Sequence, residues 1–198
     1  MLMALSVMHC TSSPRDAAPA WPRLPRTQVT LLDRTAWRGV LSWPDDCEAS
    51  FQASRASEDG GLEFADVGER VSVVAVLCAA GSYQPSHVFV RLDERARLPL
   101  VSLLSFSVYT SEDGTTLTRS DATEIWGEPT LSADTKELRV LALARQTGDC
   151  GVWTRYDIGS DAPRLLEARA RQPCPDTPET PAFGAPGEPP EGWAPVAR

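Results

Sequence analysis

The chain is poor in the residues that most often build catalytic and metal centres. It has two histidines, and none of its five cysteines are near enough to each other for the paired spacing of a zinc site. It contains no nucleophile elbow, phosphate-binding glycine loop, dinucleotide fingerprint or zinc-protease helix. These absences argue against a metalloenzyme, a serine hydrolase and a nucleotide-dependent enzyme. We therefore expect no metal, no cofactor and no catalytic residue.

Clustered basic residues and long apolar runs are also absent. The formal net charge is −8, with 19 Lys and Arg scattered among 27 Asp and Glu. Because phosphate binding needs Lys and Arg gathered on one face, this composition argues against a nucleic-acid partner. No apolar run approaches the ~20 residues that a membrane-spanning helix requires. We expect contact with a membrane only through a lipid anchor.

Residues 1–30 resemble an export leader followed by a disordered tether. The apolar run MLMALSVMHC ends at Cys10, and the residues after it are polar and rich in proline. A bacterial lipoprotein leader has this order, and its cysteine carries the lipid. No basic residue precedes Arg15, however, and Met8 and His9 are larger than the residues preferred before a lipidated cysteine. We predict a periplasmic or outer-membrane lipoprotein with Cys10 as the lipidation candidate; the alternative is the disordered N-terminus of a cytoplasmic protein.

Four cysteines remain in the folded part once the leader is set aside. An even number suits two disulfide bonds in an oxidising compartment. Of the three possible pairings we predict Cys47–Cys78 and Cys150–Cys174, because each pair brackets one of the two similar units described below. Cys150 lies in a glycine-flanked turn, TGDCGVW. A reactive thiol there would need a base, and His87 is the one candidate in the folded part, so a structural role is favoured.

The middle of the chain has mostly β patterns. Dense β-branched or alternating runs predict strands at 70–79, 86–93, 137–145 and 152–159. Residues 99–110 and 115–120 flank the turn sequence SEDG and predict a hairpin. Residues 47–61 are the one segment for which a short helix is an alternative prediction. That helix would end before Gly60-Gly61.

Two parts of the chain are similar when one is shifted by 67 positions. The matches include Val71 with Leu138, Val73 with Val140, Gly81 with Gly148 and Phe89 with Tyr156. Each unit has a strand, a glycine turn, a second strand, and then a proline followed by leucines, which is typical of a β-meander. The alternative to a duplication is that any two β-hairpins share such a pattern of strands and turns.

These patterns predict a mainly β protein, an antiparallel sheet or sandwich built from two similar meander units, with little helix. We expect the leader and tether at 1–30, the β domain at 31–172 and a proline-rich, extended tail at 173–198. Within that tail, Cys174 and Trp193 are the residues expected to contact the body.

Several segments together resemble a known family. The motifs that carry the resemblance are Trp126-Gly127-Glu128-Pro129, Gly148-Asp149-Cys150-Gly151, the later Cys174, and the closing GWAPV segment around Trp193. On these motifs residues 37–198 resemble the bacterial family catalogued as domain of unknown function 1176. The resemblance implies an exported, envelope-associated protein, but no activity and no catalytic residue. A long proline-rich insertion between Cys174 and Trp193 departs from the family pattern.

Three functions are compatible with these observations. The leading hypothesis is a non-catalytic binding module for a protein or glycan partner of the cell envelope, which includes an inhibitor of a cell-wall-degrading enzyme because an acidic surface complements basic lysozymes. Trp43 and Trp126 lie beside turns and are the candidates for an exposed binding surface. The alternatives are a hydrolase that uses two carboxylates facing each other across a cleft, and a purely structural envelope protein.

Overall fold

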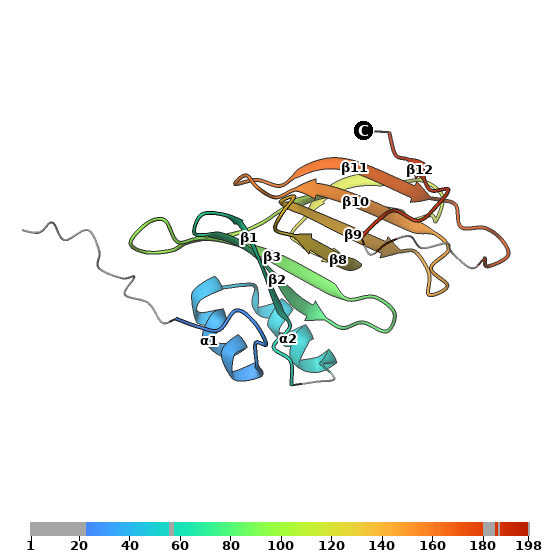
Figure 1. Ribbon diagram of the computed structural model, residues 1–198. Helices are drawn as coiled ribbons and strands as arrows, with labels where there is room; N and C mark the ends of the chain where they lie inside the picture. Colours follow the sequence, from blue (N-terminus) through green and yellow to red (C-terminus); the bar gives the residue numbers. More distant parts are fainter. Residues whose placement is uncertain (1–22, 56–57, 180–184, 186, 198) are drawn as a thin grey trace, which may run out of the picture.

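Two antiparallel sheets pack face to face, and two helices cover the outer face of the first sheet (Figure 1). The computed structural model describes residues 23–55, 58–179, 185 and 187–197. The predicted mainly β fold with antiparallel sheets is confirmed. Cys10 and most of the predicted leader lie outside the described residues.

The first sheet contains a meander of four strands. Its strands in order are β1 (Leu62–Gly68), β2 (Val71–Ala79), β3 (Ser86–Asp93) and β4 (Leu100–Leu103), and β7 (Glu124–Trp126) pairs with β3 beyond the end of β4. The sequence of β2, VSVVAVLCA, is apolar almost throughout and nearly all of its side chains are buried. A strand needs such a sequence when both of its faces are covered, here by the second sheet and by the helices.

The second sheet contains a matching meander. Its strands are β8 (Glu128–Ser132), β9 (Glu137–Leu143), β10 (Gly151–Asp157) and β11 (Arg164–Arg171), and the short β12 (Ala194–Pro195) pairs with the outer edge of β11. A hairpin of β5 (Phe106–Thr110) and β6 (Thr118–Ala122) connects the two sheets along the chain. The hairpin was predicted correctly, although the run 99–110 forms two strands instead of one.

The core between the sheets contains three of the four residue pairs given above as matches of the internal alignment. Val71 and Leu138 both lie in it, as do Val73 and Val140, and Phe89 and Tyr156. The ring of Phe106 lies between those of Phe89 and Tyr156, with centroid separations of 5.3 and 5.1 Å and edge-on geometry. Each meander therefore contributes residues to one shared core, and the duplication stays a prediction.

The helices are α1 (Leu31–Leu41) and α2 (Asp45–Ser54). Thr30 and Asp33 form a capping box at the start of α1, which the sequence analysis did not predict as a helix. The helix considered at 47–61 begins and ends earlier, as α2. Both helices pack on the second face of β2 and β3, where a core of Trp37, Leu41 and Cys47 meets valines of the sheet.

The body begins before residue 31. Val29 is buried, and the indole nitrogen of Trp37 donates a hydrogen bond to the carbonyl oxygen of Pro25 at 2.7 Å. Arg26 forms an ion pair with Glu94. Residues 23–30, which the sequence placed in the tether, thus pack against the helices and the first sheet.

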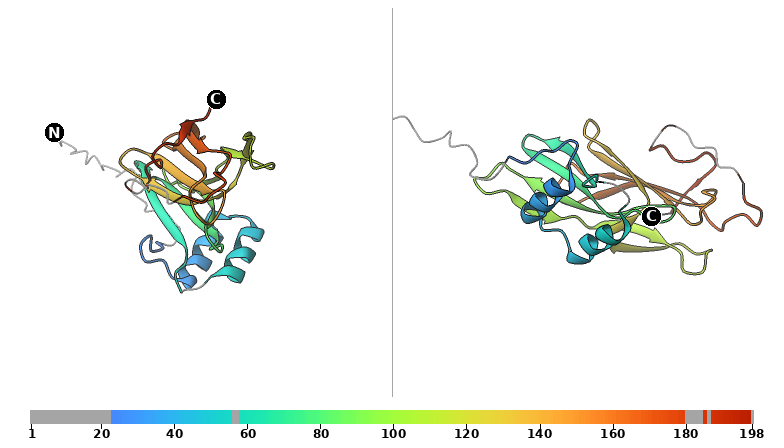
Figure 2. Two further views of the ribbon diagram at one scale, coloured as in Figure 1. Left: turned by 90° about the vertical axis from the view of Figure 1, so that its right-hand side faces the viewer. Right: turned by 90° about the horizontal axis from the view of Figure 1, so that it is seen from below.

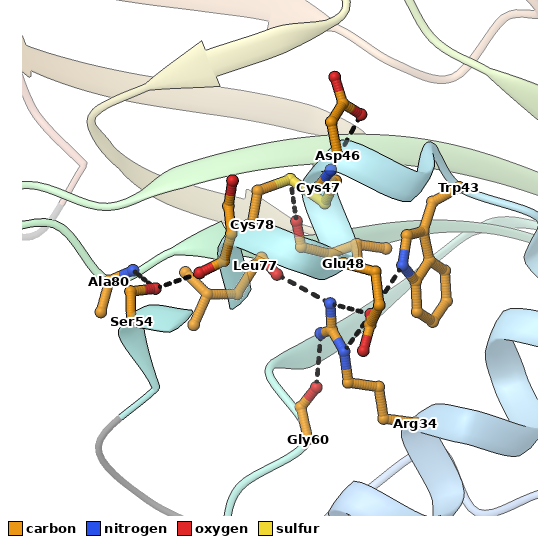
Figure 3. The surroundings of a disulfide bond; sticks show 12 residues. Arg34, Trp43, Asp46, Cys47, Glu48, Ser54, Gly60, Leu77, Cys78 and Ala80 are labelled. Atoms are coloured by element: carbon orange, nitrogen blue, oxygen red, sulfur yellow. Dashed lines mark hydrogen bonds and ion pairs between the residues drawn. A yellow bond between two sulfur atoms is a disulfide. The ribbon is translucent and has the colours of Figure 1, made fainter. Parts of the chain in front are cut away.

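A buried arginine connects the helices to the sheet. Arg34 is 1% exposed, and its guanidinium contacts the carboxylate of Glu48 at 2.9 Å (Figure 3). It also donates to the carbonyl oxygens of Gly60 at 2.8 Å and Leu77 at 3.1 Å, and it stacks on the ring of Phe51. One side chain therefore links α1, α2, the segment before β1 and the end of β2.

The carboxylate that pairs with this arginine is also well satisfied. Burial alone would raise the pKa of Glu48, but hydrogen bonds from Gln52, Arg34 and Trp43 hold it below its usual value. The neighbouring Cys47–Cys78 disulfide joins α2 to β2, with a Cα–Cα distance of 4.4 Å. The disulfide thus holds α2 on the sheet, and the ion pair of Arg34 with Glu48 joins α2 to α1.

We expect the substitution Arg34→Met to lower the free energy of unfolding by about 3–5 kcal/mol, because it removes the positive charge that pairs with the carboxylate of Glu48 and the donor to two carbonyl oxygens. The matched control is Arg38→Met, which removes an exposed ion pair with Asp45 and should cost less than about 1 kcal/mol. Urea unfolding of the oxidised proteins measures both. Equal losses in the two variants would contradict the assigned role of Arg34.

Candidate functional site

Both predicted disulfide bonds are present. Cys47 is bonded to Cys78, and Cys150 is bonded to Cys174 with a Cα–Cα distance of 5.2 Å. Such bonds persist in oxidising environments, so they indicate an extracytoplasmic location. Of the helices in the described ranges, none is both long enough and apolar enough to span a bilayer.

A buried carboxylate organises the turn that contains Cys150. The side chain of Asp149 is fully buried, and it accepts hydrogen bonds from Arg145 at 2.7 Å, from Thr147 at 2.6 Å and from the backbone N–H of Glu179 at 3.0 Å. Arg145 also donates to the carbonyl oxygen of Pro175 at 2.9 Å. The bond from Arg145, followed by those from Thr147 and Glu179, holds the pKa of Asp149 well below its usual range.

This turn holds the start of the C-terminal segment. Further contacts hold the later part of that segment. The indole nitrogen of Trp153 donates to the carbonyl oxygen of Gly187 at 2.9 Å, and Arg139 pairs with Glu188 at 2.7 Å. Trp193 is buried, and β12 follows it directly. The described parts of 173–197 therefore run along the second sheet on the side away from the helices (Figure 2). The tail was predicted as extended chain, and its contacts extend well beyond Cys174 and Trp193.

An open pocket of about 300 Å³ lies beside the Cys150 turn. It is formed where β5 and β9 end and β10 begins, and the chain just after β11 closes one side. Among the described residues, no charged side chain lines it. Its walls include Tyr109, Ser111, Leu117, Leu143, Val152 and Gln172.

Two buried polar atoms of the pocket lining are unpaired. Tyr109 is 9% exposed, and its hydroxyl has no hydrogen-bond partner among the described residues. The same is true of Oε1 of Gln172. By contrast, the buried hydroxyl of Tyr156 donates to the carbonyl oxygen of Ser107 at 2.9 Å. Both atoms are closed off from solvent, so neither is offered to a ligand in the pocket, and each costs about 1–3 kcal/mol as an unpaired buried group.

A second, shallower depression of about 190 Å³ lies on the first sheet, lined in part by Glu63 and His87. Burial lowers the pKa of His87 to about 4, and Nδ1 of its ring is unpaired within the described part of the chain. Burial, and secondarily the charge of Glu128, raises the pKa of Glu63. Glu63 is exposed to solvent, and Glu128 is not among the described residues that line the depression, so this pair does not match the two carboxylates across a cleft of the hydrolase hypothesis.

The two tryptophans proposed as a binding surface have different environments. Trp43 is 3% exposed, its ring lies against the guanidinium of Arg34 and its indole nitrogen donates to Glu48. The prediction that it is exposed was wrong, because the turn that carries it is covered by both helices. Trp126 is 50% exposed on β7, as expected. Tyr109 and Gln172 were not among the predicted site residues, because their setting arises from the packing of a hairpin on a distant sheet.

No family model, no curated protein and no solved structure matches this chain. The resemblance to domain of unknown function 1176 stays a prediction.

We expect Asp149→Asn to lower the urea midpoint at pH 7 and to make less difference at about pH 3. The folded-state pKa of Asp149 is depressed, so its stabilisation is fully present above the unfolded value of about 3.9 and is lost as the pH falls through the lower folded value. Asp134→Asn, in the exposed turn between β8 and β9, is the control and should leave the midpoint unchanged at both pH values. A deficit of Asp149→Asn that grows on acidification would contradict this role.

Proposed function

We propose that the protein is an exported bacterial envelope protein that acts as a non-catalytic binding module for a protein or glycan partner. The observation that carries the proposal is the open pocket beside the Cys150–Cys174 bond, where none of the described lining residues is charged. The two disulfides support export. A place in the periplasm or on the outer membrane, with a lipid on Cys10 and membership of the family catalogued as domain of unknown function 1176, is part of the same proposal.

The pocket is suited to binding because its walls are fixed before a ligand arrives. The Cys150–Cys174 bond and the contacts of Asp149 hold the turn on one side of it. The strands β9, β10 and β11, which are paired along their lengths, form another side. A site that needs little ordering on binding loses less entropy, so a few contacts give useful affinity.

The chemistry of the lining favours binding over catalysis. General acid–base catalysis uses a group whose pKa lies near the working pH, most often His, Asp, Glu or Lys, and none of these lines the pocket. Cys174 lines it, but its sulfur is bonded to Cys150 and is not a free nucleophile. The polar groups of the pocket are neutral donors and acceptors, which orient a ligand without transforming it.

The alternative of a carboxylate-based hydrolase is favoured by one observation, the raised pKa of Glu63 beside Glu128 and His87. It requires the shallow depression to hold the substrate. The binding module would use the pocket beside Cys150, and the hydrolase would use the depression lined by Glu63 and His87. Mapping the residues that envelope material contacts therefore distinguishes the two functions.

We expect solubilised envelope polysaccharide and peptidoglycan fragments to shift the backbone amide NMR signals of residues around Tyr109, Leu117 and Gln172. The variant Ala144→Trp places an indole in the pocket and should abolish these shifts, since Ala144 lines the pocket. The control Ala162→Trp adds the same ring at an exposed loop position and should preserve them. Shifts confined to Glu63 and His87, or shifts that survive Ala144→Trp, would count against the proposal.

A further inference from the structure

One edge of the first sheet is apolar and open. It is formed by β4, with β7 continuing along β3 beyond it, and no strand of the described ranges pairs with its outer side. Four of the six large apolar side chains that are exposed in the described part of the chain lie along this edge: Leu98, Leu100, Leu103 and Trp126, at 40 to 73% exposure. From Leu98 to Ser111 the sequence has no charged residue. The β4 edge therefore lacks the charges that usually keep a free strand from pairing.

The other three edges of the two large sheets, as far as the structure describes them, carry such protection. β1 contains Glu63 and Asp66, and its register is irregular just after Asp66. β8 begins with Glu128 and Pro129, and β12 is two residues long and ends in Pro195. Charges, prolines, bulges and short strands all discourage a further strand from adding to an edge. Of these edges, β4 is the one open to strand addition.

The backbone of β4 presents a defined set of groups outward. The N–H of Leu104 donates to the carbonyl oxygen of Phe89 at 2.9 Å, and the bonded residues alternate along an antiparallel strand. Ser102 is therefore bonded to β3, whereas Val101 and Leu103 direct their N–H and C=O groups away from it. Within the described ranges these two residues have no backbone partner on the outer side.

These outward groups match those of a second copy of the chain. A two-fold axis at Ser102 sets Val101 opposite Leu103 of the other copy, and the two residues exchange both backbone bonds on each side of the axis. Moving the axis toward the start of β4 brings Pro99, which has no N–H, into the ladder. Moving it toward β7 sets the carboxylate of Glu124 beside an apolar side chain. We propose that β4 of one copy pairs antiparallel with β4 of another in the Ser102-centred register.

Charges at the two ends of this edge are complementary in the same register. Arg97, exposed in the loop before β4, and Glu124, at the start of β7, form no ion pair within the described residues. Because β7 continues the line of β4, the axis at Ser102 sets Pro99 opposite Glu124 of the other copy. Arg97 lies two residues before Pro99 and is then a diagonal neighbour of that carboxylate. Two such pairs offset part of the repulsion between copies that each carry a net charge of −8.

The first test is the oligomeric state of the full oxidised chain, measured by sedimentation velocity as the concentration rises. Strand addition over so short an edge makes a small interface, so we expect a reversible dimer with a Kd of about 1–100 µM. A chain that stays monomeric up to about 0.5 mM overturns the inference. The β4 edge is separate from the pocket beside Cys150, so this result leaves the proposed function untouched.

Hydrogen exchange of the backbone amides tests the register. The amides of Val101 and Leu103 should exchange more slowly as the dimer forms, because they gain partners in the other copy. The amide of Ser102, which is bonded to β3, should exchange at the same rate at every concentration. A dimer that leaves the amides of Val101 and Leu103 unchanged uses another surface and overturns the inference.

A lysine on the edge should block pairing. Leu103→Lys puts on β4 the charge that natural edge strands use, and we expect it to weaken the dimer at least about tenfold. Leu103 is 40% exposed, so the melting temperature should change little. The control Gln146→Lys adds the same charge at an exposed loop position of the second sheet and should leave the Kd unchanged. Equal association of Leu103→Lys and the wild type would contradict the proposal.

Charge reversal tests the ends of the edge without altering β4. Arg97→Glu and Glu124→Arg should each weaken the dimer about fivefold, because each replaces two attractive contacts with repulsive ones. The double variant re-forms the pairs with opposite signs and should restore the wild-type Kd. If the losses of the two single variants simply add in the double variant, these residues do not meet and the proposed arrangement is wrong.

Discussion

The bond between Cys150 and Cys174 is the constraint on which the proposed site depends. It joins the start of β10 to the chain that follows β11, over a sequence separation of 24 residues. In the chain-entropy model a loop of this length is worth about 3 kcal/mol. The bond also fixes the position of Gln172, two residues before Cys174, against the pocket. The buried Asp149 adds ionic and backbone contacts to the same turn, so this end of the sandwich is held by bonds of several kinds.

The two meanders share one core but are covered differently on their outer faces. The first sheet is covered by α1 and α2, held by Arg34 and the Cys47–Cys78 bond. The second sheet carries the C-terminal segment, held by the Cys150–Cys174 bond and by contacts of Trp153 and Arg139. Inward-facing positions of the two meanders, such as Val73 and Val140, pack in that shared core. Their surroundings at the ends of the strands differ, which left an uncharged pocket in one and an acidic depression in the other.

The features that local pattern determines were predictable, and those that depend on tertiary packing were not. The runs at 70–79 and 137–145 are strands because β-branched and apolar residues dominate them. The sequence left three disulfide pairings open, and the internal repeat only favoured the one observed. Helix α1 was missed although Thr30 and Asp33 supply its capping box. Trp43 was misjudged because a residue beside a turn is exposed only if nothing packs over the turn. The pocket is lined by residues more than sixty positions apart, such as Tyr109 and Gln172, and no local sequence pattern predicts that these residues lie together.

The most direct test of this account is a non-reducing peptide mass map of the protein expressed with its native upstream region. The account predicts one linked peptide pair containing Cys47 and Cys78, another containing Cys150 and Cys174, and an N-terminus that is cleaved or that carries a lipid on Cys10. Free thiols at all five cysteines on an intact chain would contradict it. The pocket would then lose the bond that holds its wall, and the envelope location would lose its main support.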